Sequence, residues 1–383
     1  METMLSSEDL AYGDRCKTYA EGELAALAAK YGEINDVPNE LRLSLAGAGL
    51  FRYLIPEEYG GLGLSAVRVC LAREVLAGVY SPADVTLAMQ GLGSYSIVIG
   101  GTIKQKKRYL PAVASGEKLT TYALTEPNAG SDVNNLETVA EAVDGGYILT
   151  GRKRFISNGY SADMAVIFAK TPSPDNPRAI SAFVIEKGTE GYEVDRRLKL
   201  ISAHDIVSLK LDQAMIPKEN LLGDIGDGYK LAMQTLYFMR TSVGAAALGM
   251  GQVAMDEALT YAQKRVQFGS SIARQQGIMF KLAEMATDLE AARVLVYTAA
   301  IKKDREAPDA PLAASMAKLY ATEAAWRAID QAVQIHGGVG VMKGSQVERL
   351  YREIRSLRIY EGTSEIQKLV ISRALFKAAK KAK

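Results

Sequence analysis

The chain is 383 residues long, enough for two or three domains. Its apolar fraction of 48% is ordinary for a soluble globular protein, and 46 Lys and Arg residues against 44 Asp and Glu residues give a net charge of +2. This balance excludes the strongly charged surface that binding to nucleic acid or to a membrane usually requires.

The cysteines and histidines are few and isolated. Cys16 and Cys70 stand far apart, as do His204 and His336. Their spacing excludes a disulfide framework and shows no metal-binding pattern, so the sequence predicts a protein of the reducing cytoplasm. The N-terminal segment is charged and lacks an apolar run, and no apolar run along the chain is long enough to span a bilayer. We therefore expect no signal peptide and no transmembrane helix.

Residues 1–118 are expected to form an N-terminal helical domain. The segment 66–80 has apolar residues at helical spacing, and a short helix within 102–117 is expected to stop near Pro111 and Gly116. The segment 61–66 (GLGLSA) superficially matches a dinucleotide-binding fingerprint. It follows a turn rather than a strand, so we reject that interpretation.

Residues 119–222 have a different pattern of apolar residues and are expected to form the middle domain. Short runs rich in β-branched and aromatic residues alternate with turn signals such as Asp-Gly-Gly at 144–146. This pattern predicts an antiparallel all-β domain, with a small barrel as the expected form.

Residues 223–383 are expected to form a C-terminal helical domain. A very long helical pattern covers 229–268, two more cover 280–305 and 312–336, and a final helix is expected to begin near Thr363. Small residues within the first pattern should allow close approach of other helices. The predicted fold class is therefore α+β, with an N-terminal helical domain, a middle antiparallel β-barrel and a C-terminal four-helix bundle.

Two segments of the β domain could bind a ligand. In YALTEPNAGSDV (122–133), a turn and small residues leave backbone N–H groups and hydroxyls in a polar loop, which could grip a carbonyl-rich ring or a phosphate. An ordinary β-turn explains the same residues. In KRFISNG (153–159), Phe155 and Ser157 could stack on and bond to a flat ring, although simple strand packing is the alternative.

Three further segments lie in the C-terminal region. Arg265 stands near a helix end, where a cation complements the helix dipole, and a plain helix cap accounts for it equally well. The glycines of QIHGGVG (334–340) permit close backbone approach, and His336 is not interpreted as catalytic. In RIYEGTSEIQKL (358–369), Glu361 could be a surface charge, a helix-start carboxylate or a base aimed at a ligand.

Five of these segments occur together and in order: ALTEPNAGSD, KRFISNG, RVQFG, QIHGGVG and YEGTSEIQ. They resemble the signatures of the acyl-CoA dehydrogenase family, and the resemblance covers almost the whole chain. It implies non-covalent binding of FAD and α,β-dehydrogenation of an acyl-CoA thioester to the 2-enoyl-CoA. It also implies transfer of the electrons to an electron-transferring flavoprotein, and a homotetramer built as a dimer of dimers.

The resemblance assigns roles to individual residues. The expected flavin contacts in the β domain are Tyr122, Leu124, Thr125, Gly130, Ser131, Phe155, Ile156 and Ser157. Those expected to reach the FAD of a neighbouring subunit are Arg265, Phe268, Gln276, Gln334, Gly337 and Gly338. Thr363 and Glu365 should meet the cofactor at the start of the last helix, where a helix N-terminus suits a diphosphate.

Glu361 matches the catalytic base of the family in its commonest position. Some members carry the base on a middle helix instead, but the matching residue here is Met239, which cannot accept a proton. The residues expected to contact the substrate are Ser131, Arg240, Tyr360 and Gly362. Two departures from the family pattern stand out: Tyr237 replaces a frequent aspartate, and LISAHDI (200–206) replaces the LG-x-R-x-S segment.

The mechanism implied is proton abstraction next to a thioester. Glu361 would remove the α-proton, a backbone N–H would stabilise the developing enolate oxygen, and the β-hydride would go to flavin N5. Gly91 and Gly93 lie in the segment that matches the acyl pocket, and their lack of side chains could admit a branched or cyclic group such as cyclohexanecarboxyl. A plain helix break is the alternative explanation.

Other functions fit the pattern less well. A short- or medium-chain straight-chain dehydrogenase and an acyl-CoA oxidase that uses O₂ share the expected architecture. A nitroalkane oxidase uses an aspartate base, which the glutamate disfavours. A non-enzymatic helical scaffold would be a colourless protein.

Overall fold

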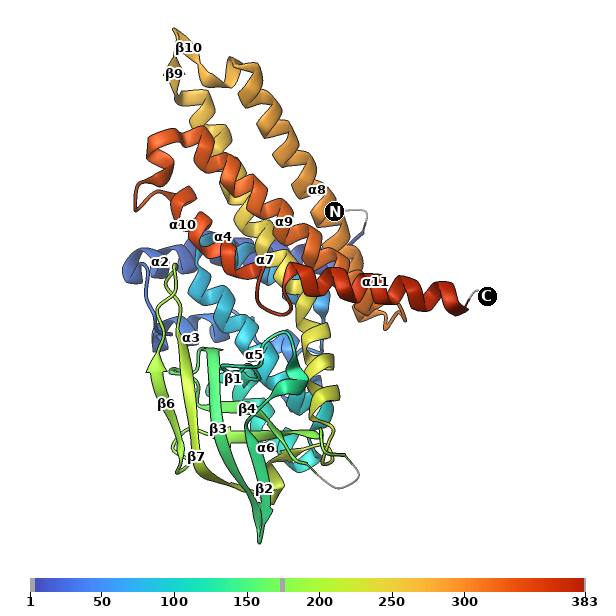
Figure 1. Cartoon of the computed structure of the whole chain (residues 1–383). Coiled ribbons are helices and arrows are strands. Elements are labelled where there is room, and N and C mark those ends of the chain that lie inside the picture. Colours follow the sequence, from blue (N-terminus) through green and yellow to red (C-terminus); the bar gives the residue numbers. More distant parts are fainter. Residues whose placement is uncertain (1–3, 173–175, 382–383) are drawn as a thin grey trace. The chain divides into compact units, whose positions relative to one another are not determined.

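Figure 1 shows the computed structural model of the chain, which describes residues 4–172 and 176–381. The chain forms two compact units, and each is assembled from separate segments of the sequence. The first unit contains residues 1–26, 66–81 and 240–383. The second contains residues 27–65 and 82–239.

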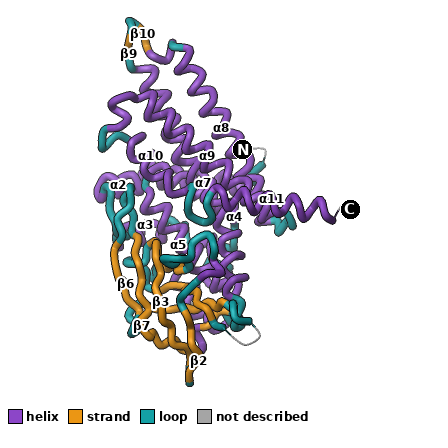
Figure 2. Tube along the Cα trace, viewed as in Figure 1, coloured by secondary structure: helices purple, strands orange, loops and turns teal. Residues whose placement is uncertain are grey.

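The second unit combines helices with a β-sheet (Figure 2). Its main helices are α3 (Asn39–Gly47), α5 (Ser81–Gly100, of which Ser81 belongs to the first unit), α6 (Ile103–Ala114) and the beginning of α7 (Gly228–Lys264). Helix α6 begins with a capping box between Thr102 and Gln105. The helix ends at Ala114, between Pro111 and Gly116, where the sequence predicts its stop, and Gly116 has a φ of +72°.

The sheet has the strand order β6-β7-β3-β2-β4-β5-β8, and β1 pairs with β4. Figure 1 shows β6, β7, β3 and β2 next to one another. The strands are β1 (Thr120–Ala123), β2 (Val139–Val143), β3 (Gly146–Ser157), β4 (Met164–Lys170), β5 (Ile180–Glu186), β6 (Tyr192–Arg197), β7 (Ile206–Pro217) and β8 (Leu221–Leu222). The expected wholly antiparallel arrangement is corrected at two pairings, since both β1 and β2 run parallel to β4. The sheet is therefore mixed.

Local sequence explains several features of this sheet. Strands β2 and β3 form a hairpin through Asp144 and Gly145, and Gly145 has a φ of +84°. A left-handed turn of this kind suits Asp-Gly, as the sequence predicted. Strands β4 and β5 are buried along almost their full length, which accounts for their uninterrupted apolar runs.

The first unit is a helical bundle (Figure 1). Its helices are α1 (Ser7–Tyr19), α4 (Ala66–Val79), the remainder of α7, α8 (Gln276–Asp304), α9 (Ala310–His336), α10 (Gln346–Leu357) and α11 (Ser364–Lys381). Helix α9 is central, because it packs against α8, α10 and α11. A small hairpin, β9 (Val266–Gln267) and β10 (Ser270–Ser271), joins α7 to α8.

Small residues on α7 let its neighbours approach closely, as predicted. A Cβ at Gly249 would lie 1.6 Å from the carbonyl oxygen of Glu74 on α4. A Cβ at Gly251 would lie 2.7 Å from Leu289 on α8. Glycine is therefore required at Gly249, where the obstacle is backbone that cannot rotate away.

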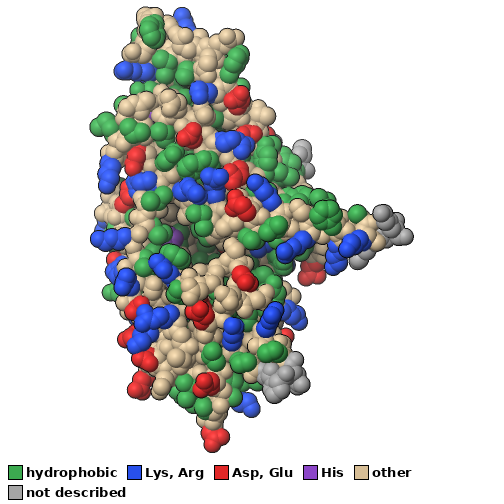
Figure 3. Space-filling view, viewed as in Figure 1, with side chains coloured by type: hydrophobic (Ala, Val, Ile, Leu, Met, Phe, Trp, Pro, Cys, Tyr) green, Lys and Arg blue, Asp and Glu red, His purple; other side chains and the backbone are tan. Residues whose placement is uncertain are grey.

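The sequence predicts no transmembrane helix, no disulfide and no strongly charged surface. None of the described helices is long and apolar enough to cross a membrane. Cys16 and Cys70 are buried and form no disulfide. Basic and acidic side chains are interspersed over the face in Figure 3, in keeping with the small net charge.

Candidate active site

The loop between α10 and α11 carries Glu361. Its backbone is unusual, because Glu361 has a φ of +54° and Gly362 a φ of +93°. A residue with a Cβ is disfavoured in the left-handed region by about 1–2 kcal/mol, so surrounding contacts must hold it there. The φ of Gly362 explains why a glycine stands there, because an L side chain rarely adopts it, and a Cβ would also lie 2.4 Å from Nε2 of Gln367.

Three side chains hold this loop through its carbonyl oxygens. Arg240 Nε donates to the carbonyl oxygen of Glu361 at 3.3 Å, and Lys318 Nζ donates to that of Gly362 at 2.8 Å. Gln367 Nε2 donates to both carbonyls, at 3.2 and 3.0 Å. Because Arg240, Lys318 and Gln367 are all buried, their donors are fixed in place and determine where the side chain of Glu361 starts.

Lys318 also places a buried positive charge beside Glu361. Burial lowers the pKa of Lys318 to about 8, against the opposing effect of the Glu361 charge. A pKa near 8 leaves the ammonium group mostly protonated at neutral pH. The carboxylate of Glu361, a half-buried residue, therefore has a buried cation near it.

The start of α11 follows directly. Thr363 Oγ1 accepts a hydrogen bond from the backbone N–H of Ile366 at 3.3 Å and thereby caps the helix. Ser364 Oγ and Arg358 Nε both donate to Glu323 on α9, at 2.5 and 2.9 Å. These contacts fix the loop at both of its ends.

In the second unit, the predicted flavin residues gather where β1 and β3 end. Thr121 Oγ1 donates to the carbonyl oxygen of Ser157 at 2.6 Å, and the backbone N–H of Arg154 donates to that of Thr125 at 2.9 Å. Phe155 has a φ of +59° at a register shift between β3 and β7. This bulge turns its ring outward, and 49% of Phe155 is exposed.

A buried ion pair supports this region. Lys153 Nζ lies 2.6 Å from Glu126 Oε1, and the two side chains are 0% and 1% exposed. The Glu126 carboxylate also accepts the backbone N–H groups of Glu137 and Thr138, so it closes the loop that begins at β1. Burial alone would raise the pKa of Glu126, but the charge and hydrogen bonds of Lys153 outweigh it and the pKa is lowered.

The other predicted residues of the second unit divide into two groups. Tyr122, Leu124 and Ile156 are buried, and the Tyr122 hydroxyl donates to the carbonyl oxygen of Ala232 at 3.3 Å. Gly130 and Ser131 are exposed on the loop after β1. The side chains within reach of solvent at the strand ends are therefore Thr125, Ser131, Phe155 and Ser157.

The residues predicted to reach a neighbouring subunit lie at one end of the bundle. Tyr261 of α7 stacks on His336 of α9, with ring centroids 4.4 Å apart, so the ends of these two helices are adjacent. The His336 ring is buried and its Nδ1 lies 2.8 Å from the carbonyl oxygen of Ala332, which indicates a structural role. The predicted residues around this end are all exposed: Arg265, Phe268, Gln276, Gln334, Gly337 and Gly338.

The two glycines considered for the acyl pocket face protein atoms. A Cβ at Gly91 would lie 2.5 Å from Sδ of Met239, and one at Gly93 would lie 2.4 Å from Oγ1 of Thr120. Helix α5 is continuous across both, so the helix-break alternative is wrong. Close packing explains these glycines, and Met239 is buried in the same contact.

Sequence reasoning missed the residues that support the site. Lys318 and Gln367 hold the loop of Glu361, while Glu126 and Lys153 hold the loop after β1. A lysine within the apolar helical run of 312–325 was the one available signal, because a buried cation requires a partner. The others depend on contacts between segments distant in sequence.

The residues present fit the predicted FAD. Thr125, Ser131 and Ser157 supply hydroxyls suited to the carbonyls and nitrogens of a flavin ring, and Phe155 supplies an exposed aromatic face. Among residues 4–172 and 176–381, no group of three or more His, Cys, Asp or Glu side chains could hold a metal ion.

Comparison with known families defines the class of protein. Residues 6–117 match the N-terminal domain of acyl-CoA dehydrogenases, residues 121–213 the middle domain and residues 226–376 the C-terminal domain. The chain belongs to the acyl-CoA dehydrogenase family, and is therefore an oxidoreductase. The family is thus confirmed as predicted, and so is the order of an N-terminal helical, a middle β and a C-terminal helical domain.

Individual relatives match over nearly their full length. An acyl-CoA dehydrogenase of Bacillus subtilis is 40% identical over 374 residues, covering 97% of this chain and 98% of the relative. The caffeyl-CoA reductase-Etf complex subunit CarC of Acetobacterium woodii is 39% identical, covering 94% and 96%.

Solved structures of acyl-CoA dehydrogenases have the same fold as this chain. Butyryl-CoA dehydrogenase from Megasphaera elsdenii superimposes with a TM-score of 0.92 at 36% identity, covering 97% of this chain and 99% of that one. Acyl-CoA dehydrogenase complexed with FAD from Bacillus anthracis gives a TM-score of 0.91 at 33% identity, covering 98% and 69%.

Proposed function

We propose that this protein dehydrogenates an acyl-CoA thioester between its α and β carbons and that Glu361 is the base. The observation that carries this proposal is the loop of Glu361, held in a left-handed conformation by Arg240, Lys318 and Gln367. A surface charge would need no such restraint. A base must be positioned, because proton transfer depends on its distance from the proton.

The chemistry needs both proton removal and charge stabilisation. A C–H bond beside a thioester is a weak acid, so Glu361 takes the α-proton while a developing negative charge appears on the thioester oxygen. The backbone N–H of Glu361 is the donor proposed for that oxygen. Tyr360 and Gly362 shape the loop on either side of the base, and Ser131 and Arg240 remain proposed substrate contacts.

The cofactor is FAD, as the family membership and the FAD complex of the Bacillus anthracis relative support. When bound, it supplies the acceptor for the β-hydride. In the second unit, we propose that Thr125, Ser131, Phe155 and Ser157 hold the flavin ring. In the first unit, Thr363 and Glu365 stand at the start of α11, and we propose that backbone N–H groups there bind the diphosphate, since the N-terminus of a helix attracts anions.

The proposed electron acceptor is an electron-transferring flavoprotein. The name of the Acetobacterium woodii relative includes an Etf complex, which supports this choice over O₂. Reduction of such a flavoprotein, compared with O₂ consumption under the same conditions, separates a dehydrogenase from an oxidase.

A homotetramer is proposed from the exposed end of the bundle. Phe268 is 97% exposed, and Phe280, Val341 and Met342 are also exposed in this part of the chain. Large exposed apolar patches mark interaction surfaces, and we propose that a second copy of the chain covers these side chains. Arg265, Gln276 and Gln334 would then reach the cofactor of that copy.

The acyl group is proposed to be short or ring-bearing. The butyryl-CoA dehydrogenase structure favours a short straight chain, whereas the name of the caffeyl-CoA reductase relative favours a ring. The glycines of α5 no longer support the cyclic class, because protein atoms fill the space beside them. A panel of butyryl-, isobutyryl- and cyclohexanecarboxyl-CoA, each tested for flavin reduction, discriminates between the two.

Replacing Glu361 by glutamine tests the base. The variant should bind FAD and acyl-CoA but reduce the flavin about 10²–10⁴-fold more slowly, since glutamine cannot accept the proton. Loss of flavin absorbance is followed anaerobically after mixing with substrate. Glu257→Gln, an exposed carboxylate on α7, is the matched control. Near wild-type reduction by Glu361→Gln would exclude this assignment.

A further inference from the structure

His204 contacts one of the proposed flavin residues. Its Nε2 lies 2.8 Å from Oγ of Ser157, a residue 47 positions earlier in the chain. The contact follows from the sheet, because Ser157 pairs with Ile206 where β3 and β7 meet. His204 stands two residues before that pair, on the segment that enters β7.

The segment that carries His204 is fixed from several sides. The backbone N–H of His204 donates to Asn35 Oδ1 at 2.9 Å. The backbone N–H of Asn158 donates to the carbonyl oxygen of Asp205 at 2.7 Å. The backbone N–H of Ser161 donates to the carboxylate of Asp205 at 3.1 Å. The imidazole therefore cannot drift away from Ser157 without breaking these bonds.

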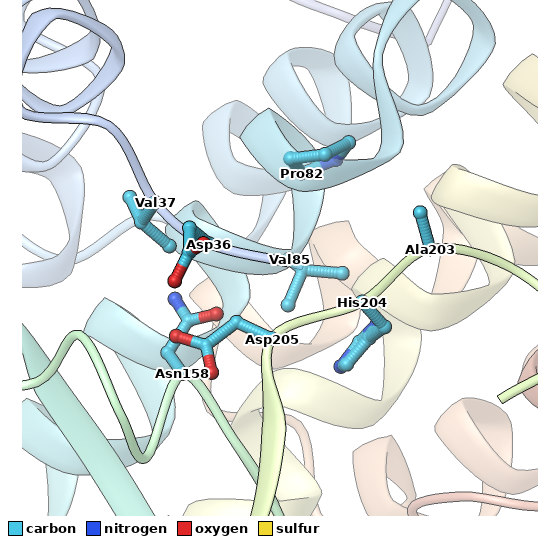
Figure 4. Close-up of a pocket in the computed structure, with 8 residues that line it drawn as sticks. All are labelled: Asp36, Val37, Pro82, Val85, Asn158, Ala203, His204 and Asp205. Atoms are coloured by element: carbon cyan, nitrogen blue, oxygen red, sulfur yellow. The ribbon is translucent and has the colours of Figure 1, made fainter. Parts of the chain in front are cut away.

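Figure 4 shows the small pocket beside this segment. Its lining includes Asp36, Asn158, His204 and Asp205. The charged residues in this lining are Asp205 and Asp36, and Asp36 pairs with Arg197 at 2.7 Å.

The surroundings of the His204 ring favour its neutral form at physiological pH. Burial lowers the pKa of His204 to about 4. A neutral imidazole has one N–H donor and one acceptor nitrogen, so its hydrogen bond to Ser157 has a definite direction set by the tautomer.

We propose that His204 is a positioning residue: its Nε2–H donates to Ser157 and directs the serine hydroxyl hydrogen toward the N5 edge of the flavin ring. This inference rests on the proposed function, in which Ser157 meets the flavin. A serine hydroxyl has one hydrogen. If that hydrogen went to His204, Ser157 could offer only an acceptor to N5, which in the oxidised ring is itself an acceptor.

The chain allows a direct test of the tautomer, because it contains only two histidines. In protein labelled with ¹⁵N and ¹³C histidine, the His204 ring should show a proton on Nε2 and should not titrate between pH 5.5 and 8, values chosen around the unperturbed histidine pKa of about 6.5. His336→Gln assigns the two sets of signals. A His204 ring that is protonated on Nδ1 alone, or that titrates within this range, overturns the proposal.

A double-mutant cycle tests whether His204 acts through Ser157. Ser157→Ala and His204→Ala should each slow flavin reduction by about fivefold to tenfold, as expected for one hydrogen bond. Each should also shift the flavin reduction potential. The double variant should match Ser157→Ala, and His204→Gln, which keeps an N–H donor, should recover much of the loss. Effects that add in the double variant overturn the proposal.

The same measurements separate this inference from the proposed function. If Ser157→Ala alters the flavin potential while His204→Ala and His204→Gln leave it unchanged, only the role of His204 fails. If Ser157→Ala itself has no effect on bound FAD, the proposed flavin site fails. Should His204→Ala not fold, His204→Gln and the tautomer of the unmodified protein still decide the matter.

Discussion

Replacing Lys318 by methionine tests whether the loop of Glu361 depends on a buried cation. Lys318 is fully buried and its Nζ donates to the carbonyl oxygen of Gly362 at 2.8 Å. Methionine has a similar length and keeps the apolar contacts, but it cannot donate. A hydrogen bond from a charged group contributes about 1.5–3 kcal/mol. If the transition state needs this loop geometry, flavin reduction should slow by about 10- to 100-fold.

Stability should respond much less than the rate. The lowering of the Lys318 pKa from 10.5 to about 8 corresponds to a net cost of about 3 kcal/mol for the charged form, after the nearby carboxylates have offset part of the burial cost. Methionine removes this cost together with the hydrogen bond, so the two effects offset each other. The free energy of unfolding at pH 7 should change by less than about 2 kcal/mol.

The pH dependence of stability has a definite sign. Unfolded lysine keeps its proton up to about pH 10.5, whereas folded Lys318 releases it near pH 8. The unfolded state therefore binds more protons between these values, and wild-type stability gains from Lys318 as pH rises through that window. Lys318→Met should lose this gain in stability. Burial also lowers the pKa of Lys153 to about 8, and the variant should keep the gain in stability that comes from Lys153.

The assay combines anaerobic stopped-flow reduction of the flavin with urea unfolding at pH 7 and at about pH 9.5, inside the titration window. Lys230→Met, an exposed lysine on α7, is the matched control and should leave both quantities unchanged. A Lys318→Met variant that folds normally and reduces its flavin within twofold of wild type would refute the role of this cation.

Three further changes have defined outcomes. Lys153→Met leaves Glu126 buried without its cation, so the free energy of unfolding measured in urea should fall by about 3–5 kcal/mol. FAD should also dissociate more readily. Unchanged stability would contradict the role of this ion pair. Gly249→Ala would push a methyl group against the backbone of Glu74 and should cost about 3 kcal/mol or more. Gly277→Ala on α8 meets no atom within 4 Å and serves as its control. Phe268→Ser should yield a smaller species in light scattering if this exposed ring lies in the subunit interface; an unchanged mass would remove it from that interface.

Much of the fold could be predicted from local patterns. The helical stripe of α4, the Asp-Gly turn between β2 and β3 and the long pattern of α7 each depend on residues close together in the chain. The β-branched runs likewise indicated strands, but they carry no information on which strands pair. The parallel pairing of β1 with β4 therefore went unpredicted.

The sequence by itself determined the family, the order of helical and β regions and the residue types of the proposed site, because motifs such as YEGTSE are local and ordered along the chain. Only the tertiary structure decided which side chains position the residues of the proposed site. Lys318 lies 43 residues before Glu361 in the sequence, and His204 lies 47 residues after Ser157, yet each pair is close in space. Such contacts arise from helix packing and strand register, which depend on the whole chain, so no spacing within one segment reveals them.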